Sequence, residues 1–350
     1  MPFVSPLGPP TPVPAGGLAP DAPRPSASPV VPRPLRPLLV PLLRQDPAQV
    51  DFGVRRFRLR PGPARGVLQR AGEAFLTGFH AALNVRDLPG LVAEVDLLPV
   101  ERRGFAYEGA GMACAVLDLL TGARGNRCAA LMAGPAVRYP HLVQIGTGWA
   151  YARLRSRPRH GSPGAGPPEC WLAWDGYGFH QGFFAPDRVI GRQHVERGLT
   201  NDQRAVRDQG LGRALWFHEC ADPDGIALRV AEFPPPRRGD LWSGVGLAAT
   251  YAGGATPEEL RRLTEVAREH RAELAQGSAF ACKAHHFSGA VPVHTVEAAR
   301  ALTGGPVEEA AHWTDRARAA LGPAPAGIDD YQRWRAGIRD LYRRSRREDT

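Results

Sequence analysis

The stretch WDGYGFHQ, residues 174–181, carries the motif that decides the fold. The motif is one residue, then Gly, any residue, a small residue or His, any residue, and usually Ala. It begins at residues 77, 108, 145, 175, 209, 243 and 276, which gives spacings of 31, 37, 30, 34, 34 and 33 residues. A period near 34 residues is the length of one helix–turn–helix repeat. Forty glycines produce chance matches, but the near-constant last three spacings favour a true repeat.

The segments around the motif have the sequence patterns of helices. Apolar residues recur at helical spacing from Leu68 to Leu83, and Thr256-Pro257 is a cap followed by a typical first helical residue. Gly destabilises a helix interior by about 1 kcal/mol, so its recurrence indicates close approach of neighbouring helices. We predict an all-α fold of tandem α-hairpin repeats of about 34 residues, forming a superhelix or a closed α/α toroid.

The chain divides into three regions by composition. Residues 1–45 are rich in Pro and are expected to be a disordered tail, with an apolar patch at Leu38–Leu43 that docks on the body. Residues 46–322 form the predicted α-hairpin repeat domain. Residues 323–350 are expected to form a basic C-terminal helix.

Composition limits the function classes. The chain has 350 residues, 43% of them hydrophobic, and a net charge of +9. That is enough apolar material for a large core. No apolar run reaches the ~18 residues of a membrane span, and the five cysteines show no CxxC pair. The arginine cluster at 343–347 is the one concentration of charge, so we expect no nucleic-acid partner and a cytoplasmic protein, with membrane association as the alternative.

Ionisable and aromatic residues lie within the motifs. If the helices stack, the first residues of the motifs converge on one face: Glu108, Asp175, Gln209, Ser243 and Gln276. An acid/base pair among aromatic rings is typical of an apolar pocket that transfers protons. The candidate catalytic residues are Asp175, Glu108, His180 and Asp240. The candidate substrate-binding residues are Trp174, Tyr177, Phe179, Trp216, His218 and Trp242.

Structural roles are the alternative for each of these residues. Acidic residues before Gly are often helix caps, His180 and His218 can be core histidines, and Arg238 can form an ion pair with Asp240. We expect no metal site, because there is no HExxH or DDxxD motif and the adjacent His285 and His286 point in different directions on a helix. No cofactor is indicated.

Seven segments together resemble the UnbL family, a bacterial family of unknown function. They are FLTGF (75–79), FAYEGAGMA (105–113), QIGTGWAYARL (144–154), WDGYGFHQGFF (174–184), DQGLGRALWF (208–217), RRGDLWSGVGLAATYAGG (237–254) and QGSAFACKA (276–284). The resemblance covers residues 50–315. The best-known members are encoded with enediyne polyketide biosynthesis, which implies a specialised-metabolite pathway and a long conjugated polyene as the substrate class. The resemblance supplies no set of catalytic residues.

Three functions remain open at this point. The first is an enzyme or enzyme subunit that binds a hydrophobic polyene intermediate in an aromatic-lined helical cavity, with Asp175 or Glu108 as general acid or base. The second is an isoprenoid cyclase-like enzyme, whose cationic intermediates aromatic walls would stabilise. The third is a non-catalytic scaffold for membrane-bound accessory proteins of the same pathway, because α-hairpin arrays often bind protein partners.

Overall fold

Every regular element that the structure describes is helical. The structure is a computed structural model, and it describes residues 36–85, 87–122, 126–158, 168–323 and 327–348. The predicted all-α fold is confirmed within these ranges, which contain no strand. No helix in the same ranges combines the length and the hydropathy that a bilayer crossing requires.

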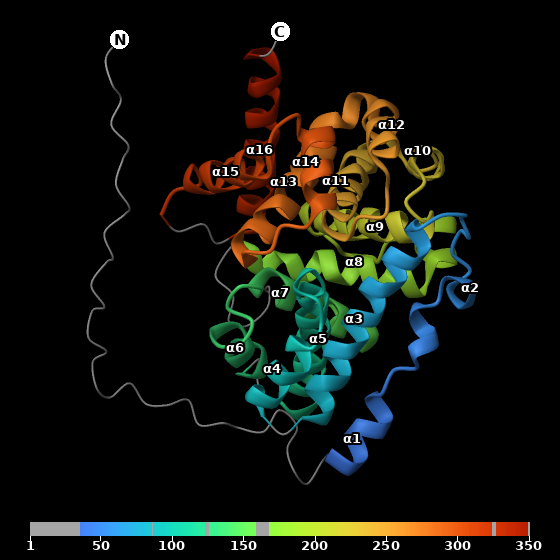
Figure 1. The fold of residues 1–350 in the computed structure, drawn as a ribbon, viewed down its shortest axis with the longest axis vertical. Coiled ribbons are helices and arrows are strands. Elements are labelled where there is room, and N and C mark those ends of the chain that lie inside the picture. The colour runs from blue at the N-terminus through green and yellow to red at the C-terminus, as the bar shows by residue number, and fades with distance from the viewer. Residues whose placement is uncertain (1–35, 86, 123–125, 159–167, 324–326, 349–350) are drawn as a thin grey trace, which may run out of the picture.

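Seven helices of the described chain form its main body, and each packs against the next along the sequence (Figure 1). They are the helices that carry the glycine motif: α3 (Ala64–Asn84), α5 (Arg103–Thr121), α7 (Pro140–Arg153), α8 (Leu172–Phe184), α9 (Asn201–His218), α11 (Pro235–Ala252) and α13 (Arg271–Ser288). The colour in Figure 1 therefore changes steadily from α3 to α13 across the molecule.

The glycines bring the backbones of successive helices into contact. A Cβ added at Gly146 of α7 would lie 2.1 Å from the carbonyl oxygen of Glu108 in α5, and one added at Gly148 would lie 2.0 Å from that of Ala173 in α8. The two glycines are two residues apart, which is about 200° around a helix, so they lie on opposite sides of it. Each central helix is thus held between its two neighbours at one crossing.

The order of these contacts shows the helix directions. Gly176 lies against Ile145 while Gly148 lies against Ala173, so residue numbers rise along α7 as they fall along α8. The same reversal holds between α3 and α5, where Gly78 meets Ala106 and Phe75 meets Gly109. The motif helices are therefore antiparallel to their neighbours.

The connecting segments are less regular than the predicted repeat. Four of them contain a short α-helix: α4 (Leu88–Asp96), α6 (Asn126–Ala133), α10 (Pro223–Ala231) and α12 (Pro257–Ala267). By contrast, α7 leads to α8 through the 3-10 turn Glu169–Trp171, and α8 leads to α9 through the π-helical turn Asp187–Gly191. A uniform α-hairpin repeat and a closed toroid are not confirmed.

Both ends of the described chain pack on the body. At the N-terminal end α1 (Arg36–Leu43) and α2 (Phe52–Arg55) precede α3, and at the C-terminal end α14 (Val293–Thr303) and α15 (Val307–Ala319) lead to α16 (Ile328–Glu348). The region expected to be a disordered tail contains helix α1. Of the apolar patch expected to dock on the body, Leu43 is buried, whereas Leu38 and Leu42 are 72% and 73% exposed. Residues 1–35 lie outside the described residues.

The C-terminal helix α16 is basic, as predicted, but it does not stand apart from the body. Its residues Tyr331, Trp334 and Ile338 are buried in the same apolar core as the motif helices. These residues are three and four positions apart, so they form one face of the helix. The arginines lie mostly on its remaining surface, and the last turns extend beyond the body in Figure 1.

Candidate functional site

A buried line of polar side chains runs along one face of the motif helices. It contains the first residues of the motifs in α5, α8, α9, α11 and α13, as predicted: Glu108, Asp175, Gln209, Ser243 and Gln276. Gln209 Nε2 donates to Asp175 Oδ2 at 2.8 Å, and Ser243 Oγ lies between the amide oxygens of Gln209 and Gln276 at 3.3 and 2.9 Å. The convergence of these residues on one face is therefore confirmed.

Arg213 of α9 joins the two carboxylates of this line. Its guanidinium donates to Asp175 Oδ1 at 2.5 Å and lies 3.6 Å from Glu108 Oε1. Burial lowers the pKa of Arg213, but attraction to Asp175 and Glu108 more than offsets this and holds its pKa above the usual value. Arg213 is therefore a permanent buried cation between two acids.

One cavity of about 570 Å³ lies beside this cation. Its wall is largely aromatic and comes from α3, α5, α7, α8 and α9: Phe75, Phe105, Trp149, Phe179, Phe183, Phe184 and Phe217. Polar groups come from Glu108, Arg213 and His180. The remaining lining includes polar and charged residues on two other sides: Arg153 and Arg155, and Arg44, Gln45, Asp46 and Gln49 next to α1. We call this the aromatic cavity. Its size and lining are those of a small-molecule site.

Glu108 is the ionisable group of the aromatic cavity that responds near neutral pH. Its side chain is only 2% exposed, and Trp149 Nε1 donates to its Oε1 at 3.0 Å. Burial raises the pKa of Glu108 to about 7, because the attraction of Arg213 only partly offsets the loss of water. The carboxyl can therefore both give and take a proton near pH 7.

His180 lies on the same wall but is neutral. Its ring packs edge-on against Trp149 at 5.6 Å between centroids and against Phe184 at 4.7 Å. Burial, assisted by the charge of Arg153, lowers the pKa of His180 to about 3. An imidazole in this state can take part in hydrogen bonds, but it neither takes up a proton nor supplies an imidazolium proton at neutral pH.

Asp175 lies behind the wall of the aromatic cavity rather than in it. The side chain has no exposed surface, and its two oxygens accept from Arg213 and Gln209. In this geometry Asp175 positions Arg213, while Glu108 is the buried carboxylate that lines the cavity, where Asp46 is an exposed one.

Asp240 is removed from both acids. It forms an ion pair with Arg335 of α16 at 2.9 Å, and it lines neither the aromatic cavity nor the second cavity described below. Burial raises its pKa although Arg335 opposes this. The alternative pair with Arg238 is not formed, because Arg238 donates to the backbone oxygens of Phe233 and Ala231 at the start of α11.

Of the residues predicted to bind substrate, Phe179 lines the aromatic cavity and the other five line neither cavity. Trp174 packs against Tyr177 at 5.6 Å between centroids, and Trp216 Nε1 donates to the carbonyl of Gly253 at 2.9 Å. His218 pairs with Glu219 at 3.0 Å and Trp242 is buried in the core. These five side chains stabilise helix packing in the structure.

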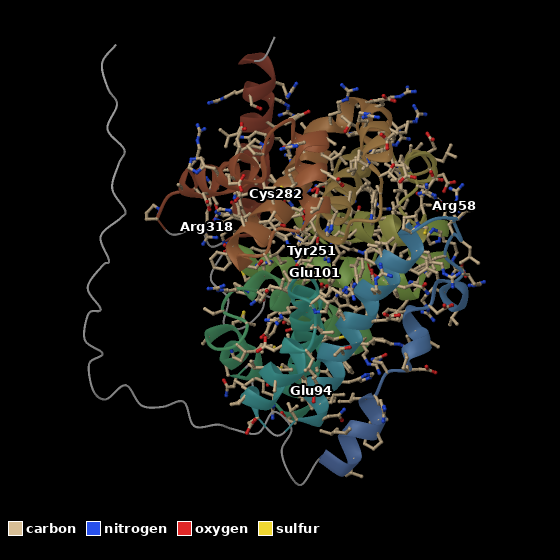
Figure 2. The ribbon with its side chains drawn as sticks, in the orientation of Figure 1. Arg58, Glu94, Glu101, Tyr251, Cys282 and Arg318 are labelled. Atoms are coloured by element: carbon tan, nitrogen blue, oxygen red, sulfur yellow. The ribbon has the colours of Figure 1, made fainter. Side chains whose placement is uncertain are left out.

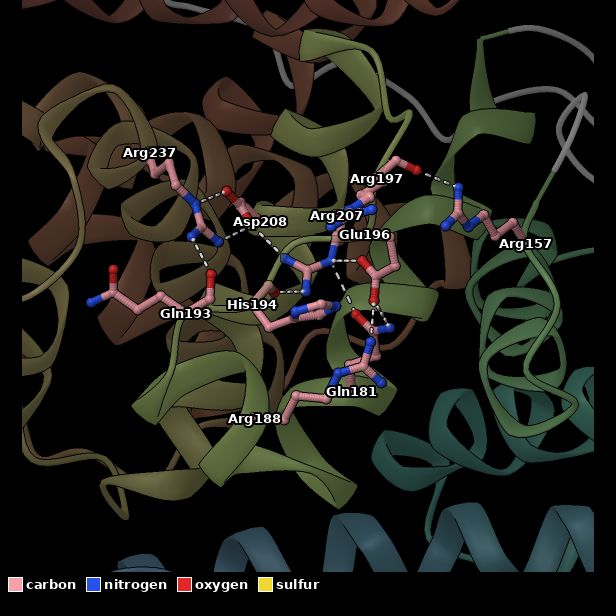
Figure 3. A network of polar contacts seen from close by, with 10 residues as sticks. All are labelled: Arg157, Gln181, Arg188, Gln193, His194, Glu196, Arg197, Arg207, Asp208 and Arg237. Atoms are coloured by element: carbon pink, nitrogen blue, oxygen red, sulfur yellow. Dashed lines mark hydrogen bonds and ion pairs between the residues drawn. The ribbon is translucent and has the colours of Figure 1, made fainter.

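A separate polar network fastens the turn between α8 and α9 (Figure 3). Its centre is Arg207, which is fully buried and contacts Glu196, Asp208 and the carbonyl oxygen of His194 at 3.0 to 3.2 Å. Arg237 of α11 binds the other side of Asp208 at 2.6 Å. Because these contacts saturate the guanidinium of Arg207 with partners from the turn, the network has a structural role.

A second cavity, of about 520 Å³, lies on the other side of Arg213. Its wall includes His141, Gln144, Tyr251, Phe280 and Trp334. Tyr251 lies near the middle of the molecule in Figure 2, and Arg318 of the same wall lies nearer the edge. Arg213 lines both cavities and therefore forms part of the wall between them.

Sequence reasoning identified Glu108, Phe179 and His180 but missed most of the other lining residues, although the motif contains their signal. The fourth residue after the first motif position lines a cavity in six successive motif helices: Met112, Trp149, Phe179, Arg213, Leu247 and Phe280. Residues four apart lie one above the other on a helix, so these side chains share the face of the polar line. The missed residues include Arg213, the cation at the centre of the site.

Among the described residues no group of three or more His, Cys, Asp or Glu side chains is placed to hold a metal ion. Comparison with curated proteins and with solved structures gave no match. Comparison with protein families gave one match, which spans residues 35–342 and therefore includes every described motif helix and both cavities. The chain belongs to the family described as proteins of unknown function, DUF1702.

Proposed function

We propose that this protein binds a long apolar chain in the aromatic cavity and moves a proton to or from it through Glu108. The observation that carries the proposal is a buried carboxyl, with a pKa of about 7, on the wall of a 570 Å³ aromatic cavity. Carboxyls tuned toward neutral pH by burial are the usual general acids and bases of enzymes.

The surroundings of Glu108 suit this role. Trp149 and Arg213 both contact Oε1, which orients the carboxyl and leaves Oε2 for a bound molecule. Asp175 takes a full hydrogen bond from Arg213, so the guanidinium neutralises Glu108 only in part. Protonated Glu108 would act as the acid and ionised Glu108 as the base.

The aromatic walls favour an extended unsaturated substrate. Phe179 lies 4.9 Å from Trp149 and 5.4 Å from Phe217 between ring centroids, so the rings form a continuous surface. Ring faces bind apolar chains and stabilise positive charge that develops when a double bond is protonated. The resemblance to the UnbL family makes a conjugated polyene of a bacterial specialised-metabolite pathway our proposed substrate class.

Binding and chemistry can be tested separately. Purified protein is titrated with diphenylhexatriene, a commercially available polyene hydrocarbon without a hydroxyl group, and binding is followed by the fluorescence of the polyene. We expect saturable binding that Ala71→Trp abolishes by filling the aromatic cavity and that Glu108→Gln retains. The control variant is Asp340→Asn, whose carboxylate is exposed on α16. Absence of saturable binding to the wild-type protein contradicts the binding proposal.

The chemical role is tested in the producing organism. The gene is deleted, and mass spectrometry identifies the metabolite that accumulates; the strain is then complemented with wild type, Glu108→Gln or Asp340→Asn. We expect Glu108→Gln to fail and Asp340→Asn to succeed. Full complementation by Glu108→Gln refutes proton transfer by this residue and assigns the protein to the scaffold role. Turnover of a prenyl diphosphate by the purified protein assigns the cavity to isoprenoid cyclisation instead.

A further inference from the structure

The second cavity has its own set of lining residues, although helix α7 contributes different residues to both cavities. Its lining comes from α6, α7, α11, α13, α15 and α16, and Arg213 is the residue it has in common with the aromatic cavity. Most of the surface is apolar, with Phe280 of α13 and Trp334 of α16 packed at 4.8 Å between centroids. A volume near 520 Å³ is within the range of ligand sites.

Two buried polar atoms on this wall have no hydrogen-bond partner. They are Gln144 Oε1 and His141 Nε2, both on α7. Gln144 is 1% exposed, and its Nε2 already contacts the Met132 sulfur at 2.9 Å, so the amide oxygen remains as an acceptor. The residues are three positions apart and therefore lie on one face of the helix. A buried acceptor without a donor is destabilising by about 1–3 kcal/mol, so each is a place where a ligand donor is favoured.

The charges on the wall of the second cavity are already compensated. Lys283 pairs with Asp315 at 2.6 Å, and Arg318 forms an ion pair with Glu169. Burial lowers the pKa of His141 to about 3, so its ring is neutral at physiological pH. Arg213 is held by its two carboxylates. The wall therefore offers acceptors but no unpaired charge for an ionic head group.

We propose that the second cavity is a separate binding site for an uncharged ligand with an apolar body and a hydroxyl group, which donates to Gln144 Oε1 or His141 Nε2. The apolar body would lie between Phe280, Leu247 and Trp334, and the hydroxyl would reach the helix α7 wall. The site is independent of proton transfer at Glu108 and of what the aromatic cavity binds.

The test compares two probes of nearly equal apolar size. Isothermal titration calorimetry measures the binding of 1-dodecanol and of dodecyl methyl ether, which cannot donate a hydrogen bond. For the wild-type protein we expect the alcohol to bind roughly tenfold more tightly than the ether, the ratio for one well-formed hydrogen bond. Gln144→Leu and His141→Phe each remove one of the two acceptors. In the variant that lacks the acceptor used by the ligand, the alcohol and the ether should bind with about equal affinity.

Space-filling variants locate the binding. Ala284→Leu on α13 and Ala129→Leu on α6 fill the second cavity from two walls, whereas the matched change Ala152→Leu fills the aromatic cavity. Circular dichroism establishes whether each variant is folded. Because two variants fill the second cavity, the test can still be made if one of them does not fold. We expect the first two to weaken dodecanol binding at least tenfold and the third to leave it unchanged.

Three results would overturn the inference. The first is no binding of dodecanol to the wild-type protein. The second is equal affinity for alcohol and ether, which would mean that water satisfies the two acceptors. The third is loss of binding only in Ala152→Leu, which would place the probe in the aromatic cavity. Diphenylhexatriene binding with no dodecanol binding would leave the proposed function standing and remove this site alone.

Discussion

The close helix crossings predict that a single methyl group at Gly210 destabilises the fold. A Cβ at this position would lie 1.8 Å from the carbonyl oxygen of Asp175 in the neighbouring helix α8. A Cβ and a carbonyl oxygen approach no closer than about 3 Å in contact, so α8 and α9 must separate by roughly 1 Å. Backbone atoms cannot rotate away as a side chain does.

The size of the effect follows from two opposing terms. Overpacking of a core destabilises a protein by about 1–3 kcal/mol, and a clash with rigid backbone lies at the upper end of that range. Ala is a better helix former than Gly by about 1 kcal/mol, which offsets part of the loss. We expect Gly210→Ala to lower the free energy of unfolding by about 2 kcal/mol.

The assay is urea denaturation followed by circular dichroism, with Gly66→Ala as the matched control. Gly66 is also inside a helix, α3, but a Cβ there would meet only the end of the flexible Arg70 side chain, at 3.1 Å. Gly66→Ala should therefore stabilise the protein by up to about 1 kcal/mol. If Gly210→Ala has the same stabilising effect as Gly66→Ala, the inference that the motif glycines permit backbone contact is refuted.

Three further predictions concern charge and capping. Burial raises the pKa of Glu108 from 4.5 to about 7, so its contribution to stability is complete below about pH 4.5 and is lost as pH rises through 7. In urea denaturation at several pH values, the free energy of unfolding of Glu108→Gln should therefore rise relative to that of wild type across this window, by about 3 kcal/mol at most. Parallel pH profiles for the two proteins would show that Glu108 does not have a raised pKa. Arg213→Met should lower the free energy of unfolding by about 3–5 kcal/mol because Asp175 keeps a buried charge. Adding Asp175→Asn should restore much of that loss, and the exposed pair of Arg56 provides a control, since Arg56→Met should change stability by less than about 1 kcal/mol in the same denaturation assay. Thr256→Ala removes the capping box of α12 and should lower the free energy of unfolding by about 1 kcal/mol, and no change in thermal unfolding would show that the cap is dispensable.

Local patterns were sufficient to predict much of the fold. The apolar spacing from Leu68 to Leu83 lies within α3, and Thr256 caps α12 as its position before Pro257 predicts. The glycine motif identified the helices that pack in succession, because a close approach of two helix backbones leaves no room for a Cβ and therefore requires Gly. The same motif placed Glu108 and Asp175 on one face.

Contacts between distant segments were not predictable from these patterns. An arginine such as Arg335 suggests a solvated helix. Packing of α16 against α13 and α15 leaves it 1% exposed, and it pairs with Asp240 of α11. The helix α1 forms despite Pro41, with Leu43 packed against the body.

The roles within the site were also assigned incompletely. Asp175 and Glu108 occupy equivalent motif positions, and the sequence does not distinguish them. Their difference comes from Arg213, which binds Asp175 at 2.5 Å and leaves Glu108 at 3.6 Å. That asymmetry depends on the placement of three helices and is visible only in the folded protein.

Within the motif, the residues that set the helix packing are different from the residues whose side chains line the cavities. The glycines set the distance between neighbouring helices. Met112, Leu247 and Phe280 line the cavities, although the backbone nitrogens of Met112 and Leu247 themselves lie at the glycine crossings. Substitution of these side chains would change the shape of the aromatic cavity or the second cavity and leave the backbone in place. If the cavities bind ligands as we propose, substitutions at a few of these lining positions would change which ligand fits without rebuilding the helix crossings.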